Sequence, residues 1–336
     1  MQQRVESYLR AINNQDLSYN VLKAPTHERY ESNWATMPHN FYMFWAKGIK
    51  GWNEKFAQMP KNHIMLDGTI GQIKSDMKFD MVLSQNKFGQ YQYLSQLAQQ
   101  MNLPLISLEH TLPMKEWGLK RREMLLSMRG KINIFISKYS IKEWGFDIND
   151  PSVRIIEHCI NSEIFKPLDN SPKDGRILTV ANDYVNRDYF LGFGIYKRIC
   201  IDGNLPVNPV GDTKGFSEAA KDLPDLVSKY QKASVFFNTS TISPVPTSLL
   251  EAMSAGLTCI STATCMIPDI IEDGVNGFIS NDEAYLKDRL IWCLKNEDKA
   301  KEIGQKARET IVKRFSLERH IRSWMDVFNE VYGKGN

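Results

Sequence analysis

The stretch "ASVFFNTSTISPVPTSLLEAMSAGLTCIST", residues 233–262, combines two apolar runs with a helical segment between them. The runs, Ala233–Ser240 and Leu257–Thr262, are of the kind that form buried strands. The segment between them follows two prolines and stops at Gly256, a residue that suits the left-handed turn at a helix end. A strand, a helix and a second strand in this order predict a βαβ unit in a parallel sheet.

The same alternation continues over most of the chain. In the first half, the runs Phe79–Gln85, Leu103–His110 and Ile132–Ser137 predict buried strands, with helices after the first and the third. A second series begins at Gly175–Asp183, after the segment Cys159–Gly175, whose Pro, Asn and Asp content indicates a linker. We therefore expect an α/β protein of two Rossmann-like, doubly wound domains with an interdomain cleft, where ligands meet the carboxyl ends of strands.

The last segment of the chain has apolar residues at helical spacing, which predicts a packing helix. These residues are Leu317, Ile321, Trp324, Met325, Phe328 and Val331.

Length and composition narrow the class of protein. At 336 residues the chain exceeds one typical core, and hydrophobic residues at 42% with charged residues at 24% exclude disorder as the main state. A net charge of +3 argues against a dedicated, highly basic nucleic-acid module. The five cysteines include no CxxC pair, so neither a disulfide framework nor a zinc site is indicated.

The N-terminal "MQQRVESYLRAINNQDLSYNVL" has no apolar run followed by small residues. No segment has the continuous apolar length of a membrane span. We therefore expect a cytoplasmic protein without stable membrane insertion.

Ser248 and Glu251 admit two interpretations. They fit the S-x-x-E capping box, in which both side chains bond to amides at the start of a helix. Alternatively, the helix follows the strand Ala233–Ser240, so its first amides face the expected ligand site, where they could bind a diphosphate.

The surrounding motifs resemble the C-terminal signature of retaining, GT-B-fold glycosyltransferases of family 4. "LLEAMSAGLTCIST" and "IPDIIEDGVNGFI" follow that signature in order and spacing, and "CINSEIFKP" resembles the start of the family's nucleotide-binding domain. "RFSLERHIRSWMDVFNEVY" resembles the family's closing helix, which crosses back onto the N-terminal domain. The resemblance implies an acceptor-binding domain of residues 1–160 with the helix 316–336, and a nucleotide-sugar-binding domain of residues 161–315. It extends from about Ile132 to the C-terminus and is weak over the first hundred residues.

By this resemblance, Glu251 matches the glutamate that bonds the ribose hydroxyls of the donor nucleotide. The family's other glutamate, next to the reactive carbon of the donor sugar, should stand at position 243, where this chain has Ser243. A serine can bond a hydroxyl, but it brings no charge to an oxocarbenium-like transition state. The replacement of this glutamate by Ser243 bears on which sugar is bound and on whether the sugar is transferred at all.

The resemblance also implies groups for the diphosphate. The backbone amides of Thr247, Ser248 and Leu249 would serve the diphosphate and the sugar. Arg187 matches the family's arginine, with a surface arginine as the alternative, and Lys214 is a looser match to its lysine.

Polar residues follow the strands expected in the first half. His110 ends the strand Leu103–His110 and resembles the histidine that the family places beside the donor sugar, whereas the alternative is a hydrogen-bonded core histidine. His27 and Glu28 follow a strand-like segment where an acceptor loop would lie, although an ordinary polar loop is the favoured interpretation. Gln85 and Asn86, at another strand end, suit acceptor or sugar hydroxyls.

The predicted function is transfer of a sugar from a nucleoside-diphosphate sugar to an acceptor hydroxyl, with retention. By the same resemblance, the leaving phosphate would help to deprotonate the acceptor, and Ser243, His110 and Arg187 would act at the reacting sugar. No metal or other cofactor is expected. A nucleotide-sugar-binding protein or partner subunit without transfer is the alternative, and an epimerase of the same fold is a third possibility.

The sequence leaves three classes of acceptor: a glycan such as a cell-surface polysaccharide, a protein, and the hydroxylated bases of modified DNA. "HNFYMFW" and "LSQNKFGQYQ" resemble segments of phage-encoded glycosyltransferases, which keeps DNA among the candidates.

Overall fold

The computed structural model describes residues 18–44, 51–66, 73–74, 76–86, 90–114, 116–168 and 172–333. Residues 1–17, which form most of the N-terminal stretch expected to lack a targeting segment, lie outside the described residues. The chain forms two compact units. The N-terminal unit comprises Met1–Glu157 and Glu318–Asn336, and the C-terminal unit comprises His158–Leu317. The chain passes from the N-terminal to the C-terminal unit after Glu157 and returns after Leu317. The boundaries predicted from the sequence lie after residues 160 and 315.

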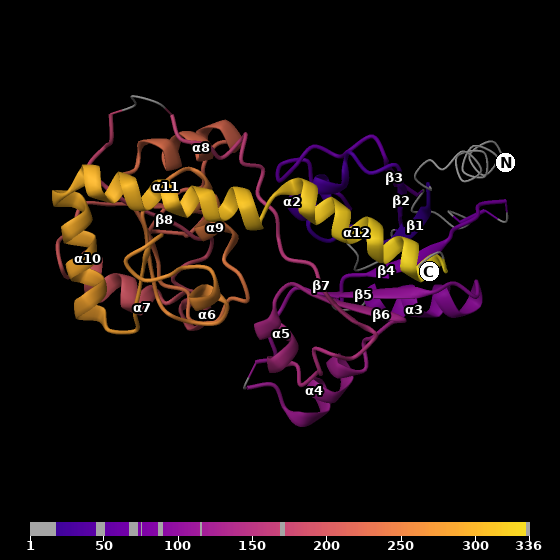
Figure 1. Ribbon diagram of the computed structural model, residues 1–336. Helices are drawn as coiled ribbons and strands as arrows, with labels where there is room; N and C mark the ends of the chain where they lie inside the picture. Colours follow the sequence, from indigo (N-terminus) through magenta and orange to yellow (C-terminus); the bar gives the residue numbers. More distant parts are fainter. Residues whose placement is uncertain are drawn as a thin grey trace. The chain divides into compact units, whose positions relative to one another are not determined.

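The N-terminal unit is built on a parallel sheet with the strand order β3-β2-β1-β4-β5-β6-β7 (Figure 1). β4, β5 and β6 are the three strands predicted from apolar runs, and helices α3 and α5 follow the first and the third of them, as predicted. Strands β3 and β7 have only three residues each, which is too short to stand out in the sequence. The elements of this unit are β1 (Asn20–Lys23), α2 (Glu28–Glu31), the 3₁₀ helix η1 (Ser32–Trp34), β2 (Asn40–Met43), β3 (His63–Met65), β4 (Met81–Ser84), α3 (Gln90–Gln100), β5 (Leu105–Glu109), α4 (Leu119–Leu126), β6 (Ile132–Phe135), α5 (Lys138–Glu143), β7 (Val153–Ile155) and α12 (Leu317–Tyr332).

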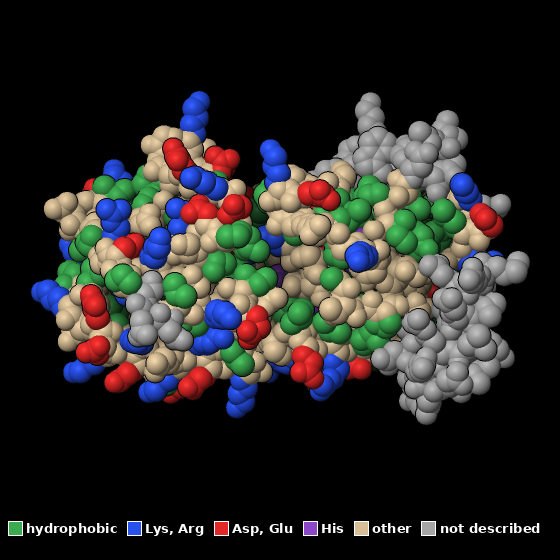
Figure 2. All heavy atoms as spheres, turned by 90° about the horizontal axis from the view of Figure 1, so that it is seen from above, with side chains coloured by type: hydrophobic (Ala, Val, Ile, Leu, Met, Phe, Trp, Pro, Cys, Tyr) green, Lys and Arg blue, Asp and Glu red, His purple; other side chains and the backbone are tan. Residues whose placement is uncertain are grey.

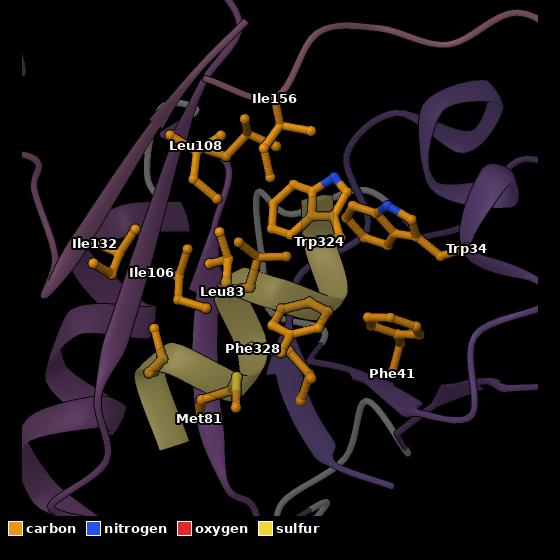
Figure 3. Close-up of a cluster of buried hydrophobic side chains, with 14 of the residues drawn as sticks. Trp34, Phe41, Met81, Leu83, Ile106, Leu108, Ile132, Ile156, Trp324 and Phe328 are labelled. Carbon is orange, nitrogen blue, oxygen red and sulfur yellow. The ribbon is translucent and has the colours of Figure 1, made fainter. Parts of the chain in front are cut away.

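The C-terminal helix α12 completes the core of this unit. Figure 3 shows Trp324 and Phe328 of α12 among side chains of the sheet and beside Trp34 and Phe41. Each large side chain buried in this way contributes about 1.5–3 kcal/mol of transfer free energy. The predicted packing face is confirmed, since Ile321 and Met325 also pack against the cluster.

The C-terminal unit contains a second parallel sheet, with the order β12-β11-β10-β8-β9. The predicted βαβ unit is confirmed as β10, α9 and β11. The elements are β8 (Ile177–Val180), α6 (Asp188–Leu191), α7 (Phe193–Tyr196), the π-helix η2 (Lys197–Ile201), β9 (Val207–Val210), α8 (Leu223–Lys232), β10 (Val235–Asn238), α9 (Thr247–Ser254), β11 (Cys259–Ser261), the 3₁₀ helix η3 (Ile267–Asp269), β12 (Phe278–Ile279), α10 (Glu283–Lys295) and α11 (Glu297–Arg314).

The segment predicted as a linker packs onto the C-terminal unit. Cys159, Ile160 and Phe165 are buried, and the Arg308 guanidinium donates hydrogen bonds to the carbonyls of Ser162 and Phe165, both at 3.1 Å. The segment is irregular as expected, but these bonds make it part of this unit rather than a loose connection.

Across the described ranges, none of the helices has both the length and the apolar character that crossing a membrane requires.

Candidate active site

In the C-terminal unit, the chain changes direction across the sheet between β8 and β10. β9 lies on the far side of β8, whereas β11 and β12 extend beyond β10. In doubly wound sheets, ligands bind outside the carboxyl ends of the strands at such a point. Here the segments that follow β8 and β10 are hydrogen-bonded to each other. The Tyr184 hydroxyl contacts Thr239 Oγ1, and the Thr241 amide donates to the Phe190 carbonyl at 2.9 Å.

Helix α9 starts beside these loops without a capping box. Its N-cap residue is Pro246, and no side chain caps the helix. The capping-box interpretation of Ser248 is therefore wrong. The Leu249 amide donates to the Pro246 carbonyl at 3.1 Å, so it is already used within the first turn. Among the described residues, the amides of Thr247 and Ser248 have no such partner, which leaves these two of the three predicted amides for an anion.

Glu251 lies in α9 with its side chain buried. Its residue is 3% exposed, and its Oε2 accepts a hydrogen bond of 2.9 Å from the Tyr230 hydroxyl. Tyr230 is itself fully buried in α8 and also approaches the Ser248 carbonyl at 3.3 Å. The carboxylate is therefore oriented by a neighbouring helix rather than by its own helix start. The sequence analysis missed Tyr230, although its place in the amphipathic α8 was a signal for a buried position.

The corresponding point of the N-terminal sheet lies between β1 and β4. Gln85 directly follows β4, and His110 directly follows β5. His110 Nε2 lies 2.9 Å from Gln85 Oε1, while Gln85 Nε2 donates to Glu31 Oε1. The His110 ring also has edge contacts with the rings of His27 and Tyr30, at centroid distances of 4.6 and 4.8 Å. These contacts assemble a buried polar group around the predicted histidine.

Glu31 forms an ion pair with Lys23, and both side chains are fully buried. Burial alone would raise the pKa of Glu31, but the charge of Lys23, together with hydrogen bonds from Lys23, the His27 amide and Gln85, lowers it. Burial lowers the pKa of Lys23, and the charge of Glu31 opposes this. The sequence analysis missed this pair. A lysine that ends the apolar run of β1 was the available signal, since buried lysines are rare unless paired.

The other predicted residues of this unit have internal partners. Glu28 is buried, and its Oε1 accepts from the Asn53 amide at 3.2 Å. Asn86 has a left-handed backbone with φ of +46°, and its Nδ2 donates to Ser107 Oγ at 2.7 Å and to the Met128 carbonyl at 3.0 Å. Asn86 therefore holds the turn after β4.

Glu109, next to His110, is a further buried carboxylate that the sequence analysis did not single out. It accepts hydrogen bonds from the Thr111 amide at 3.1 Å and from Thr111 Oγ1 at 2.6 Å, and Arg129 lies 3.7 Å away. Burial raises the pKa of Glu109 despite these partners. Its bonds fix the turn that follows β5 and thus the position from which His110 projects.

Residues 214–310 match the model of the family described as glycosyl transferases group 1. These residues include α9 and Glu251. Over these residues the chain is similar to that family. The match confirms the family resemblance at this level.

Curated relatives match shorter stretches of the chain. One is the N-acetyl-alpha-D-glucosaminyl L-malate synthase of Bacillus anthracis, 32% identical over 85 residues, which are 25% of this chain and 22% of that protein. Another is the trehalose synthase of Pyrococcus horikoshii, 31% identical over 108 residues, which are 32% of this chain and 26% of that protein. The chain thus matches only about a quarter of the length of these relatives.

Solved structures match almost the whole chain. A glycosyltransferase from Rickettsia africae has a TM-score of 0.68 at 15% identity, covering 95% of this chain and 100% of its own. The sucrose-phosphate synthase of Thermosynechococcus elongatus has a TM-score of 0.73 at 14% identity, covering 94% and 100%. HepE of Anabaena, solved in complex with UDP, has a TM-score of 0.71 at 12% identity, covering 93% and 99%. The predicted α/β class with two Rossmann-like GT-B domains is confirmed.

The matched segment, residues 214–310, contains Lys214, Ser243 and the start of α9, but it begins after Arg187. Arg187 and Lys214 are exposed, on loops that follow β8 and β9. The Arg187 guanidinium carbon lies 6.0 Å from the centre of the Phe190 ring. Ser243 is half-buried in the loop after β10. All three follow strands of one sheet and stand at its carboxyl edge.

No group of three or more His, Cys, Asp or Glu side chains in the described ranges could hold a metal ion. The expectation of metal-free chemistry stays a prediction.

Proposed function

We propose that the protein is a glycosyltransferase that moves a sugar from a nucleoside-diphosphate sugar to an acceptor hydroxyl with retention. The bond between the anomeric carbon and the diphosphate breaks, and a bond to the acceptor oxygen forms on the same face. The acceptor proton passes to the leaving phosphate. In this proposal the C-terminal unit binds the nucleotide and diphosphate, and His110 meets the sugar.

The observation that carries the proposal is the buried Glu251 carboxylate held by Tyr230 inside the matched segment. An ionised carboxylate accepts hydrogen bonds through both of its oxygens, and ribose hydroxyls are donors that it can bind. The amides of Thr247 and Ser248 at the start of the same helix suit the diphosphate, since helix N-termini bind anions. Arg187 and Lys214, exposed at the same edge, would add the positive charge that a leaving diphosphate needs.

The first experiment measures thermal stabilisation of the protein by a panel of nucleoside diphosphates and their sugars. A ligand that binds the folded state at 100 times its Kd adds about 2.7 kcal/mol of stability. We expect one nucleotide base to give a clear shift. If none of the panel shifts the melting temperature, the donor site is refuted.

Glu251→Gln then tests the role of the carboxylate. We expect nucleotide affinity to fall by about tenfold, the loss of one hydrogen bond to a charged group. Glu302→Gln is the matched control, because Glu302 is an exposed acid of α11 in the same unit. Equal affinity of both variants would contradict a ribose ligand at position 251.

The second candidate function is donor binding without transfer, and Ser243 favours it because a serine supplies no charge at the reacting carbon. Turnover of the bound donor in the presence of acceptor separates the two functions. If Ser243 disables transfer, Ser243→Glu should create or raise turnover. If the protein already transfers sugar with Ser243, the binding-only function is excluded, and the anomeric configuration of the product tests retention.

The acceptor screen compares glycans, proteins and duplex DNA with hydroxymethylated bases. On the face shown in Figure 2, acidic and basic side chains are intermixed, with no large area of one sign. This one face gives no support to tight backbone binding of DNA, which depends on clustered Lys and Arg. We propose that glycan acceptors are tested first. Transfer to hydroxymethylated DNA alone would overturn that choice and support the resemblance to phage-encoded enzymes.

A further inference from the structure

Helix α6 (Asp188–Leu191) is a single turn in the segment that follows β8, and Arg187 is its N-cap residue. A turn of this length is not stable alone, because the cost of nucleating a helix exceeds the gain from its few hydrogen bonds. The carbonyls at its end also have no partners within the helix. The position of Arg187 therefore depends on contacts that other segments make with α6.

The segment after β10 bonds to two carbonyls of this turn through one residue, Thr241. Thr241 Oγ1 donates to the Tyr189 carbonyl at 2.5 Å. The Thr241 amide donates to the Phe190 carbonyl at 2.9 Å, and the Ile242 amide donates to the same oxygen at 3.1 Å. Thr241 thus holds α6 by its side chain and by its backbone.

The two segments also meet at the end of α6. Thr239 Oγ1 donates to the Leu191 carbonyl at 2.7 Å. Gly192 follows with a left-handed φ of +69°, and a Cβ at this position would lie 2.1 Å from the Thr239 carbonyl oxygen. The two backbones are therefore packed against each other without room for a side chain, so α6 cannot shift unless the segment after β10 shifts with it.

The segment after β10 is in turn supported from its other side. β10 lies between β8 and β11 in the sheet. The Ser240 carbonyl accepts hydrogen bonds from Thr262 Oγ1 and Thr264 Oγ1, both at 2.6 Å, and these two threonines follow β11. Thr239, Ser240 and Thr262 are each at most 4% exposed. This segment is thus a fixed support for α6.

Arg187 is tied to this turn by its backbone and by its side chain. Its carbonyl accepts from the amides of Phe190 and Leu191, both at 2.9 Å. Its guanidinium carbon lies 6.0 Å from the centre of the Phe190 ring, within the range of a cation–π contact. The place of α6 therefore sets the place of the guanidinium.

We propose that Thr241 is a positioning residue, which fixes α6 and so holds the Arg187 guanidinium at the place where the diphosphate of the donor binds. The contact between Arg187 and the diphosphate rests on the proposed function. Thr241 touches no ligand and acts only through Arg187. A cation that is held in place before the donor binds stabilises the leaving diphosphate without reorganisation.

Hydrogen exchange of the full-length protein, followed by mass spectrometry, tests the support of α6 without a ligand. Thr241→Val removes the hydroxyl at similar volume. The amides of Phe190, Leu191 and Gly192, which bond within the turn, should then exchange faster. We expect an increase of about fivefold, the effect of losing one neutral hydrogen bond. Unchanged exchange in this variant overturns the role of Thr241.

Three further variants make this measurement specific. Thr241→Ser keeps the hydroxyl and should exchange like the wild type. Thr241→Ala removes the hydroxyl without placing a methyl group against the Tyr189 carbonyl, so it should raise exchange even if Thr241→Val fails to fold. Thr264→Val is the matched control, because it removes a threonine hydroxyl from the same support while Ser240 keeps its bond from Thr262. Exchange of α6 that rises equally in Thr264→Val overturns a specific role of Thr241.

The action through Arg187 is tested by calorimetry with the nucleoside diphosphate that stabilises the protein most, and with the same nucleoside without phosphate. Arg187→Met should lower diphosphate affinity by about tenfold, the loss of one hydrogen bond to a charged group, and Thr241→Val should lower it by a smaller factor. The double variant should bind no more weakly than Arg187→Met alone, since the two residues act as one unit. Affinity for the nucleoside should stay unchanged throughout. Losses that multiply in the double variant, or full diphosphate affinity in Thr241→Val, overturn the proposal.

The results separate this inference from the proposed function. If no nucleoside diphosphate binds to the wild type, the proposed function fails, and the contact of Arg187 with a diphosphate fails with it. If the diphosphate binds and Arg187→Met leaves its affinity unchanged, the donor site stands and this inference is overturned. The exchange measurement decides the support of α6 independently of either result.

Discussion

The buried ion pair of Lys23 and Glu31 yields a prediction whose magnitude can be worked out. Glu31→Leu leaves the Lys23 ammonium in a fully buried site without its counter-charge. The cost has an upper limit, because the lysine can release its proton instead. Neutralising a lysine of ordinary pKa at pH 7 costs about 4.6 kcal/mol. Breaking a buried pair typically costs about 3–5 kcal/mol, so we expect a loss of about 4 kcal/mol.

The same reasoning predicts a pH dependence of the variant. In Glu31→Leu the unfolded chain holds a proton on Lys23 that the folded chain has released, so stability rises with pH. Between pH 7 and pH 9 the deficit relative to wild type should shrink by about 2.7 kcal/mol. The double variant Lys23→Met with Glu31→Leu buries no charge, and it should recover most of the stability and lose the pH dependence.

Urea unfolding followed by tryptophan fluorescence measures these differences, since every tryptophan except Trp292 belongs to the N-terminal unit. A loss below about 1 kcal/mol for Glu31→Leu at pH 7, the scale of an exposed pair, would refute the argument. So would a deficit that does not change between pH 7 and pH 9.

Three further predictions concern other parts of the structure. Tyr230→Phe removes a 2.9 Å hydrogen bond to Glu251, so nucleotide affinity should fall by about tenfold in calorimetry. Gly304→Ala places a Cβ 2.1 Å from the Gly256 carbonyl oxygen and should lower stability by about 1–3 kcal/mol, whereas Gly118→Ala, with nothing within 4 Å, should not. Stability should decline as pH falls from about 6.5 to about 4, because the unfolded chain takes up protons on histidines that burial keeps neutral in the folded unit. The pKa values of these histidines are lowered to about 4 for His39, about 3 for His63 and about 4 for His320.

The local pattern of apolar residues was sufficient to predict much of the fold. Strands buried on both faces, such as β4, β6 and β10, are continuous apolar runs, and that pattern is visible without any partner. The spacing of Trp324 and Phe328 likewise shows one face of a helix. Strands such as β3, with a single buried residue, carry no such pattern, because their place in the sheet depends on pairing with β2.

The residues of the candidate site divide in the same way. The sequence locates His110 at the end of a strand and Glu251 within a helix, because the ends of strands and helices can be predicted from local pattern. The partners of these residues cannot, since Gln85 and Glu31 are 54 positions apart, and Tyr230 and Glu251 are 21 positions apart. Only the packed fold removes water from Lys23 and Glu31, and removal of water makes their charges strong enough to orient Gln85. The amino-acid sequence by itself thus determined the two parallel sheets and the chemical groups at their edges. The tertiary structure alone decided which of those groups are buried together, because burial is a property of packing and not of order along the chain.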